Sequence, residues 1–344
     1  STGYYLTAIA ERLAARRTAK ALCGQPAYSA RGTRAPSRET RNGVVIHRAS
    51  GTVLNKNRLF GKLVNLATLS LAIFVEALFR IKRGDTALVV TNPPLLPFLI
   101  AAVCRLKGAR SILLIHDVYP NVLVAAGMAR EDHLAVRLID ACVRRLYGRV
   151  DRVVAIGRDM AMLVAEKLAG SIDHLSIIPN WGEVSRIRPR DKAGNSLLKK
   201  LGLEGKFIVQ YAGNMGRSHD LETALRSARE LERDAGIHFL FVGEGAKKEW
   251  LRRESAKLAN VTVIDPLPRA ERDVVLSACD LSLIPFVPGM SGVSVPSRMY
   301  NVMSSGRPLV AVCDRGSEID MVIREERIGW VIDCGDAEGL SEAI

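Results

Sequence analysis

The sequence is poor in aromatic residues and contains no long uninterrupted apolar run. Phenylalanine, tyrosine and tryptophan make up 5% of the 344 residues, which predicts a mainly aliphatic core. The most apolar stretch, Leu59–Ile81, is interrupted by Lys62, Asn65, Glu76 and Arg80. Its uncharged part is too short to span a bilayer of about 30 Å. We therefore interpret this stretch as a buried crossover helix, with an interfacial helix as the alternative.

Several motifs that mark well-known chemistries are missing. The six cysteines show no metal-ligand spacing, and the six histidines include no His-Glu-x-x-His pattern. Neither a Gly-x-Ser-x-Gly elbow nor a Walker lysine motif occurs. These absences argue against a zinc site, a serine hydrolase and a P-loop enzyme, and we expect neither a metal nor a cofactor. Unpaired cysteines also favour a reducing compartment, in agreement with a cytoplasmic location.

Positive charge is abundant, and the formal net charge of +13 indicates a polyanionic partner. Nucleic acid is disfavoured, because the basic residues are not interleaved with aromatic ones and no nucleic-acid-binding motif accompanies them. An anionic membrane surface or a phosphorylated substrate is the better interpretation. A polar segment near the N-terminus is predicted to be a mobile basic loop; its arginines are Arg31, Arg34, Arg38, Arg41 and Arg48. The apolar helix that follows would offer three phenylalanines to lipid, namely Phe60, Phe74 and Phe79.

Short β-branched runs alternate with amphipathic stretches along most of the chain, which predicts parallel sheets covered by helices on both faces. The number of such units indicates two doubly wound α/β domains, 1–182 and 183–344, with ligands binding in the cleft between them at the carboxyl ends of the strands. The first domain lacks its expected opening strand. The predicted strands are Leu88–Thr91, Ser111–His116, Arg152–Ile156, Phe207–Tyr211, Phe239–Val242, Val261–Ile264, Leu281–Pro285, Leu309–Val312 and Trp330–Ile332.

The second half contains three small-residue turns, each after a predicted strand. Gly213 to Arg217 follows the first, Gly243-Glu244-Gly245 the second, and a segment from Pro285 to Arg298 the third. Glycine turns that open a helix expose backbone N–H groups to a phosphate, and arginine adds a forked cation. An ordinary turn with a solvated arginine is the plainer interpretation of the first turn alone. Three such turns on one sheet edge favour a phosphate site.

The first half offers one candidate of comparable interest. His116 and Asp117 follow an apolar strand, at the position where open α/β sheets bind their ligands. A histidine there can act in catalysis. The alternative is that His116 merely caps the strand through hydrogen bonds.

Taken together, these motifs resemble glycosyltransferase family 4, the retaining enzymes of the two-domain GT-B architecture, and in particular the branch that builds colanic acid, O-antigens and exopolysaccharides. The similarity covers nearly the whole chain. It rests on segments in both halves: Thr2–Thr7, Gly24–Tyr28, Thr91–Pro94, His116–Pro120, Ile178–Trp181, Tyr211–Arg217 and Val295–Tyr300. The resemblance implies a transferase that moves a sugar from a UDP- or GDP-linked donor to a glycan on a polyprenyl diphosphate, at the inner face of the cell membrane.

The resemblance also implies roles for individual residues. Arg217 and Arg298 would hold the leaving diphosphate, and His116 would act beside the donor sugar. Electrostatic stabilisation of the leaving group would be the main catalytic contribution. The donor site as a whole would comprise Gly3, Gly213, Asn214, Glu244, Leu267, Ser291, Gly292, Val293, Ser294 and Asn301.

The sequence departs from the family pattern in three places. Asn301 and the Met290–Ser294 segment stand where the wider family has two glutamates, and Ser218-His219 stands where many members have a lysine. The helix that usually ends the second domain is also missing. The replaced glutamates favour an alternative, a catalytically silent subunit that binds a glycan lipid or a partner enzyme, whereas the intact glycine turns and both arginines oppose it. A sugar-nucleotide epimerase of the same architecture would need carboxylates that cannot be placed.

Overall fold

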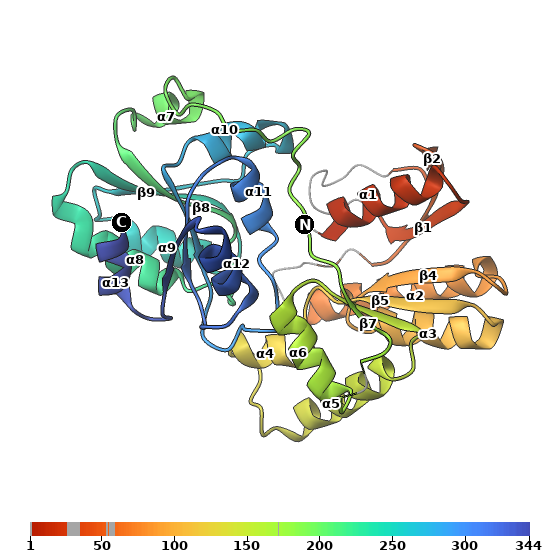
Figure 1. Cartoon of the computed structure of the whole chain (residues 1–344). Helices are drawn as coiled ribbons and strands as arrows, with labels where there is room; N and C mark the ends of the chain where they lie inside the picture. Colours follow the sequence, from red (N-terminus) through yellow and green to blue (C-terminus); the bar gives the residue numbers. More distant parts are fainter. Residues whose placement is uncertain (1, 26–34, 53, 55–58, 171) are drawn as a thin grey trace. The chain divides into compact units, whose positions relative to one another are not determined.

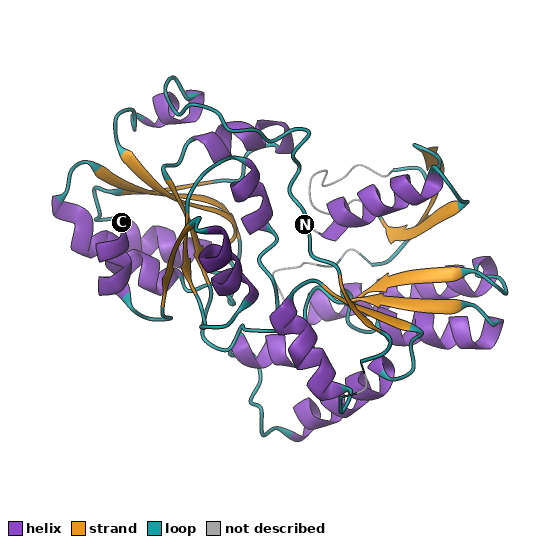
Figure 2. Ribbon diagram, in the orientation of Figure 1, coloured by secondary structure: helices purple, strands orange, loops and turns teal. Residues whose placement is uncertain are grey.

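The computed structural model describes residues 2–25, 35–52, 54, 59–170 and 172–344 (Figure 1). The chain forms two compact units. One comprises Ser1–Asp117, Leu138–Ile156 and Val164–Ile178, and the other comprises Val118–Arg137, Gly157–Leu163 and Pro179–Ile344. Both units are built from strands and helices in alternation (Figure 2). The predicted division at residue 182 stays a prediction.

The first unit contains two sheets. Four parallel strands in the order β4-β5-β6-β7 form one of them, and β1-β3-β2 form the other, in which β2 runs antiparallel to β3. The strands are β1 (Ala19–Gly24), β2 (Arg38–Arg41), β3 (Val44–Ala49), β4 (Thr86–Val90), β5 (Arg110–Leu114), β6 (Arg152–Ala155) and β7 (Leu175–Ile177). The helices of this half of the chain are α1 (Thr2–Ala14), α2 (Leu59–Arg80), α3 (Leu96–Lys107), α4 (Asn121–Ala125), α5 (Leu134–Tyr147) and α6 (Arg158–Lys167).

The prediction of a mobile basic loop is wrong for its second half. Arg38 and Arg41 delimit strand β2, and Arg48 lies in β3, where it forms an ion pair with Glu39. Charged residues made these strands difficult to predict: β2 is an edge strand whose side chains are mostly exposed, and β3 contains His47 and Arg48 among its apolar residues. Arg31 and Arg34 lie outside the described residues.

Helix α2 is buried on one side and exposed on the other. Ile73 and Ala77 are buried, whereas Leu71, Val75 and Phe79 are exposed, Phe79 to 83%. The helix packs on α3, as the interpretation of a buried crossover helix requires, and it also presents an apolar stripe. The alternative of an interfacial helix stays a prediction. Phe74 is half-buried, and the side chain of Phe60 lies outside the described part of the chain. None of the helices in the described ranges is long and apolar enough to cross a membrane.

The second unit is organised around one six-stranded parallel sheet in the order β10-β9-β8-β11-β12-β13. Its strands are β8 (Phe207–Asn214), β9 (Ile237–Glu244), β10 (Val261–Ile264), β11 (Leu281–Pro285), β12 (Leu309–Val312) and β13 (Gly329–Ile332). Its helices are α7 (Ser196–Leu201), α8 (Leu221–Glu230), α9 (Lys248–Ser255), α10 (Arg272–Ser277), α11 (Arg298–Ser304), α12 (Glu318–Glu326) and α13 (Ala337–Ala343), with short 3-10 turns at Leu231–Arg233 and Arg269–Glu271.

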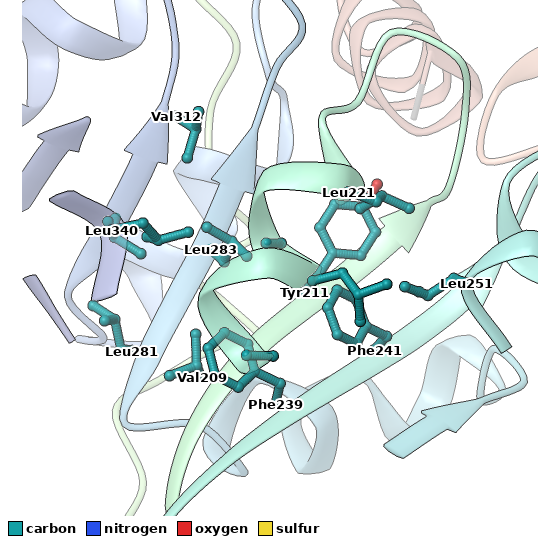
Figure 3. Close-up of a cluster of buried hydrophobic side chains, with 14 of the residues drawn as sticks. Val209, Tyr211, Leu221, Phe239, Phe241, Leu251, Leu281, Leu283, Val312 and Leu340 are labelled. Carbon is teal, nitrogen blue, oxygen red and sulfur yellow. The ribbon is translucent and has the colours of Figure 1, made fainter. Parts of the chain in front are cut away.

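Aliphatic and a few aromatic side chains fill the core between this sheet and its helices. Tyr211, Phe239 and Phe241 of the central strands pack against Leu221 and Leu251 of the flanking helices (Figure 3). Because all six strands are parallel, their carboxyl ends meet at one edge of the sheet. Open α/β sheets bind ligands at that edge, and the three small-residue turns all lie there, after β8, β9 and β11.

Candidate functional site

The turns after β8 and β9 lie side by side. The ladder between these strands continues past the predicted ends, so that Gly213 pairs with Gly243 and Asn214 with Glu244. The N–H of Met215 then donates to the carbonyl of Glu244. A Cβ on Gly243 would lie 1.9 Å from the carbonyl oxygen of Gly213. Glycine is required here because the two backbones approach so closely.

Arg298, the first residue of α11, reaches the end of β8. Its guanidinium carbon lies 4.5 Å above the centre of the Tyr211 ring, in cation–π geometry. Its Nη2 donates to the hydroxyl of Tyr211 at 3.2 Å and lies 2.9 Å from Nε2 of His219. Its Nη1 is buried and has no hydrogen-bond partner among the described residues. A Cβ on Gly213 would lie 2.8 Å from the guanidinium carbon, so this glycine makes room for the cation.

His219, whose role the sequence analysis missed, is a buried neutral base beside Arg298. Burial lowers the pKa of its imidazole well below the usual value, and the nearby charges of Arg298 and Lys247 lower it further. The ring stacks on Phe286, with centroids 5.5 Å apart. Lys247 donates through Nζ to the backbone carbonyl of His219 and to Glu222. The signal available in the sequence was the histidine itself, standing where the family pattern has a lysine.

The other predicted residues of the first two turns are more exposed. Arg217 is exposed and forms no hydrogen bond or ion pair with any residue that the structure describes. Glu244, 63% exposed at its side chain, forms an ion pair with the buried Lys248. Leu267 is partly buried and packs against the same core cluster as Ala212 of β8. All these residues lie at the carboxyl edge of the second unit's sheet.

The loop after β11 has its backbone N–H groups bound within the protein. Ser291 N–H donates to Asp314 and Gly292 N–H donates to Asp159, at 2.9 Å and 2.8 Å. The N–H of Val293 donates to the carbonyl of Met290. A phosphate that used these amides would have to displace two carboxylates, so the predicted role of Ser291, Gly292, Val293 and Ser294 stays a prediction.

Asp159 anchors this loop from the segment Gly157–Leu163 of the same unit. Its buried carboxylate also accepts hydrogen bonds from the N–H groups of Met160 and Glu318. Burial raises the pKa of this carboxyl group above its usual value, although the backbone N–H groups oppose that shift. The carboxylate therefore ties the loop to the start of α12.

Asn301 of α11 also has a partner within the second unit. Its side-chain oxygen accepts a hydrogen bond from the N–H of Glu183 at 3.1 Å. The carboxylate of Glu183 is 4% exposed and pairs with Arg269 and Arg272. The Asn301 amide thus holds the backbone of Glu183, whose buried carboxylate pairs with two partly exposed arginines. No motif in the sequence marks Glu183.

His116 and Gly3 belong to the first unit. His116 follows β5, and its N–H donates to the hydroxyl of Thr91 at 3.2 Å. Burial lowers the pKa of its imidazole to about 4, so the ring is neutral at pH 7. Gly3 lies in the first turn of α1, which begins at Thr2 and not at the predicted Tyr4, and its carbonyl accepts a hydrogen bond from the hydroxyl of Thr7.

Two sequence models of known families match the chain. Residues 2–181 match the glycosyl transferase 4-like domain, and residues 206–344 match the glycosyl transferases group 1. The chain belongs to this glycosyltransferase family. It is therefore a glycosyltransferase. Its two Rossmann-like α/β domains have the GT-B architecture, which confirms the predicted fold class.

Curated relatives and solved structures agree with this assignment. The probable glycosyltransferase WbjE of Pseudomonas aeruginosa is 33% identical over 84% of this chain and 72% of its own length. The putative colanic acid biosynthesis glycosyl transferase WcaI of Escherichia coli is 26% identical over 70% of this chain and 60% of its own length. Among solved structures, Anabaena HepE in complex with UDP and glucose is similar in fold, with a TM-score of 0.65 and 14% identity over 88% of this chain and 76% of that one.

Proposed function

We propose that this glycosyltransferase moves a sugar from a UDP- or GDP-linked donor to a lipid-linked glycan, with retention of the anomeric configuration, during synthesis of a bacterial surface polysaccharide. The name of WcaI, a putative colanic acid biosynthesis glycosyl transferase, supports a role in polysaccharide synthesis. The UDP and glucose bound to HepE support a nucleotide-sugar donor. No resident cofactor or metal enters the proposed reaction.

The observation that carries this proposal is the buried cation at the end of β8. Arg298 has an unpartnered Nη1 among the described residues, beside the glycine turn that we propose for the diphosphate. Negative charge grows on the diphosphate as the glycosidic bond breaks. A fixed cation therefore stabilises the transition state more than the ground state. Arg217 would approach the same diphosphate from the exposed turn. The acceptor would attack from the face that the diphosphate leaves.

The other predicted contacts complete the proposed donor site. Gly213 and Asn214 would contact the diphosphate, Glu244 and Leu267 the nucleoside, and Asn301 a ribose hydroxyl. His116 would contact the donor sugar; as a neutral imidazole it can both donate and accept hydrogen bonds.

Helix α2 supports a peripheral position on the inner face of the cell membrane, where a polyprenyl diphosphate acceptor would be found. Its exposed stripe, Leu71, Val75 and Phe79, is followed by Lys82 and Arg83, which are also exposed. Apolar side chains next to cations are the pattern of an interfacial helix on anionic lipid. Sedimentation with anionic vesicles should be strong at low salt and fade with screening. Equal recovery with neutral and anionic vesicles would refute this part of the proposal.

Sugar transfer by the purified protein tests the proposed function directly. A panel of UDP- and GDP-sugars is incubated with a lipid-linked glycan acceptor, and the product's anomeric configuration is determined by NMR. Transfer from one donor with retention is the expected result. The alternative, a silent subunit, is favoured by the two replaced glutamates; at one of these positions, the side-chain oxygen of Asn301 already accepts a hydrogen bond from the N–H of Glu183. Donor binding without transfer or hydrolysis would support that alternative.

A further inference from the structure

The guanidinium of Arg298 is held through one nitrogen, Nη2, whereas the other, Nη1, is buried without a hydrogen-bond partner among the described residues. Nη2 carries two N–H groups; one donates to Tyr211 Oη, and the other is directed at His219 Nε2 at 2.9 Å. Nη1 has no hydrogen-bond partner in the described ranges of the chain. Two neutral acceptors thus hold the cation without neutralising it, and this arrangement leaves the charge available to a ligand.

The arrangement requires one particular form of His219. A nitrogen that accepts a hydrogen bond from arginine cannot carry a proton, so the proton of the neutral ring lies on Nδ1. Nδ1 faces the hydroxyl of Ser218 at 3.4 Å. Burial and the two neighbouring cations, Arg298 and Lys247, keep this imidazole neutral.

The imidazole is also fixed in position. It stacks on Phe286 and meets the Tyr211 ring edge-on, with centroids 5.8 Å apart and an angle of 76°. Its backbone N–H donates to Gly216, and its carbonyl accepts from Lys247. Ring and backbone are both restrained, so Nε2 offers Arg298 an acceptor at a defined place.

We propose that His219 is a positioning residue for leaving-group stabilisation, whose Nε2 holds Arg298 so that Nη1 faces the diphosphate. This inference rests on the proposed function. It explains why a neutral imidazole is suitable at this position. A lysine would place a second cation against the Arg298 guanidinium, and the two like charges would repel each other. The hold depends on an acceptor atom and not on charge.

Substitutions at His219 separate this role from simple packing. His219→Gln places an amide oxygen near the position of Nε2, whereas His219→Asn is too short to do so, and His219→Leu retains only the apolar bulk. Binding of inorganic diphosphate and of UDP is measured by calorimetry for each variant, and thermal unfolding checks that each one folds. We expect His219→Leu and His219→Asn to bind roughly tenfold more weakly, the usual effect of losing a hydrogen bond to a charged group, and His219→Gln to bind within about threefold of wild type.

A double-mutant cycle with Arg298 distinguishes failure of this inference from failure of the proposed function. If His219 acts through Arg298, Arg298→Ala combined with His219→Leu should bind as weakly as Arg298→Ala alone. Additive losses, or equal binding by the Asn and Gln variants, would overturn the role of His219 while leaving the diphosphate site intact. Unchanged diphosphate binding by Arg298→Ala would instead overturn the proposed site, and the positioning role with it.

Discussion

The start of α11 and the turn after β8 each contribute one arginine to the proposed diphosphate site, but the two are held very differently. Arg298 lies over Tyr211, donates to its hydroxyl, and contacts His219. Arg217 is exposed and has no polar partner within the described residues. A restrained cation loses little side-chain entropy when a ligand binds, whereas an exposed one must be ordered and shed its screening ions. Although the motifs suggest equal roles, the structure predicts unequal ones.

The largest effect is expected from Arg298→Ala. Removing a fixed, partly desolvated cation should cost a few kcal/mol of transition-state stabilisation, or roughly a hundredfold or more in kcat/KM. Arg298→Lys should restore only part of the rate, because an ammonium cannot reproduce the forked contacts to Tyr211 and a ligand. Steady-state kinetics with the true donor provide the measurement. Arg252→Ala, an exposed arginine on α9, is the control, and a loss at Arg298 no larger than this control's would remove the basis of the comparison.

A smaller effect is expected from adding one methyl group beside the same cation. In Gly213→Ala the new Cβ would lie 2.8 Å from the guanidinium carbon of Arg298, closer than real contacts allow. The side chain must move away from its acceptors, and we expect roughly a tenfold loss in kcat/KM. Gly205→Ala is the control, since its φ is also positive, at +76°, but nothing lies within 4 Å of the added Cβ. Wild-type kinetics for Gly213→Ala would show that the position of Arg298 does not limit the reaction.

The sequence predicts the framework of this site better than its contacts. Strands β10, β11 and β12 have the predicted bounds, because each is a short, mostly apolar run that directly follows a polar residue or proline. Strands β1, β2, β3 and β7 are not among the predicted strands; β2 is charged and β7 has only three residues. Strands β2 and β7 are stabilised by pairing with neighbouring strands, and their own sequences show no alternation or apolar run that would predict a strand.

Contacts between distant residues account for what the sequence analysis missed in the site. His219 and Arg298 are 79 positions apart, and no local pattern indicates that a buried imidazole will accept a hydrogen bond from that arginine. The same holds for the loop after β11. Its glycines suggest free amides, but Asp159, 133 positions away from Gly292, occupies one of them. Local patterns reveal which backbone groups could bind an anion, and tertiary packing decides whether a protein carboxylate binds them first.

Arg217→Ala is expected to have a weaker effect that depends on salt. An exposed cation contributes less than a buried one, so we expect about a fivefold loss in kcat/KM at low ionic strength. The loss should shrink as salt is added, whereas the loss for Arg298→Ala should persist, because buried charges are screened less. Kinetics of both variants at two salt concentrations test this difference. Equal losses with equal salt dependence would show that the two arginines work as one unit despite their different surroundings.

The last prediction extends the comparison of environments to the first unit, where His116 is a second histidine kept neutral by burial. Its folded-state pKa of about 4 lies below its ordinary value of 6.5. The unfolded chain therefore binds more protons in this interval, and the stability contributed by His116 is lost as the pH falls from 6.5 towards 4. Between pH 7 and pH 6 the loss should be about 0.5–1 kcal/mol in the free energy of unfolding.

His116→Asn removes this titration while retaining a polar side chain. Urea unfolding at pH 7 and pH 6 should therefore show a smaller difference for the variant than for wild type. If His116 also contacts the donor sugar, the variant should lose turnover at pH 7 while its stability there stays close to that of wild type. A large loss of stability at pH 7 would favour a structural role instead, because the largely buried imidazole would then be needed for packing and polar contacts. The hydrogen bond to Thr91 is donated by the backbone N–H of His116 and is retained in the variant. If the free energy of unfolding changes equally between pH 7 and pH 6 in both proteins, burial does not lower the pKa of His116, and the imidazole is hydrated in the folded protein.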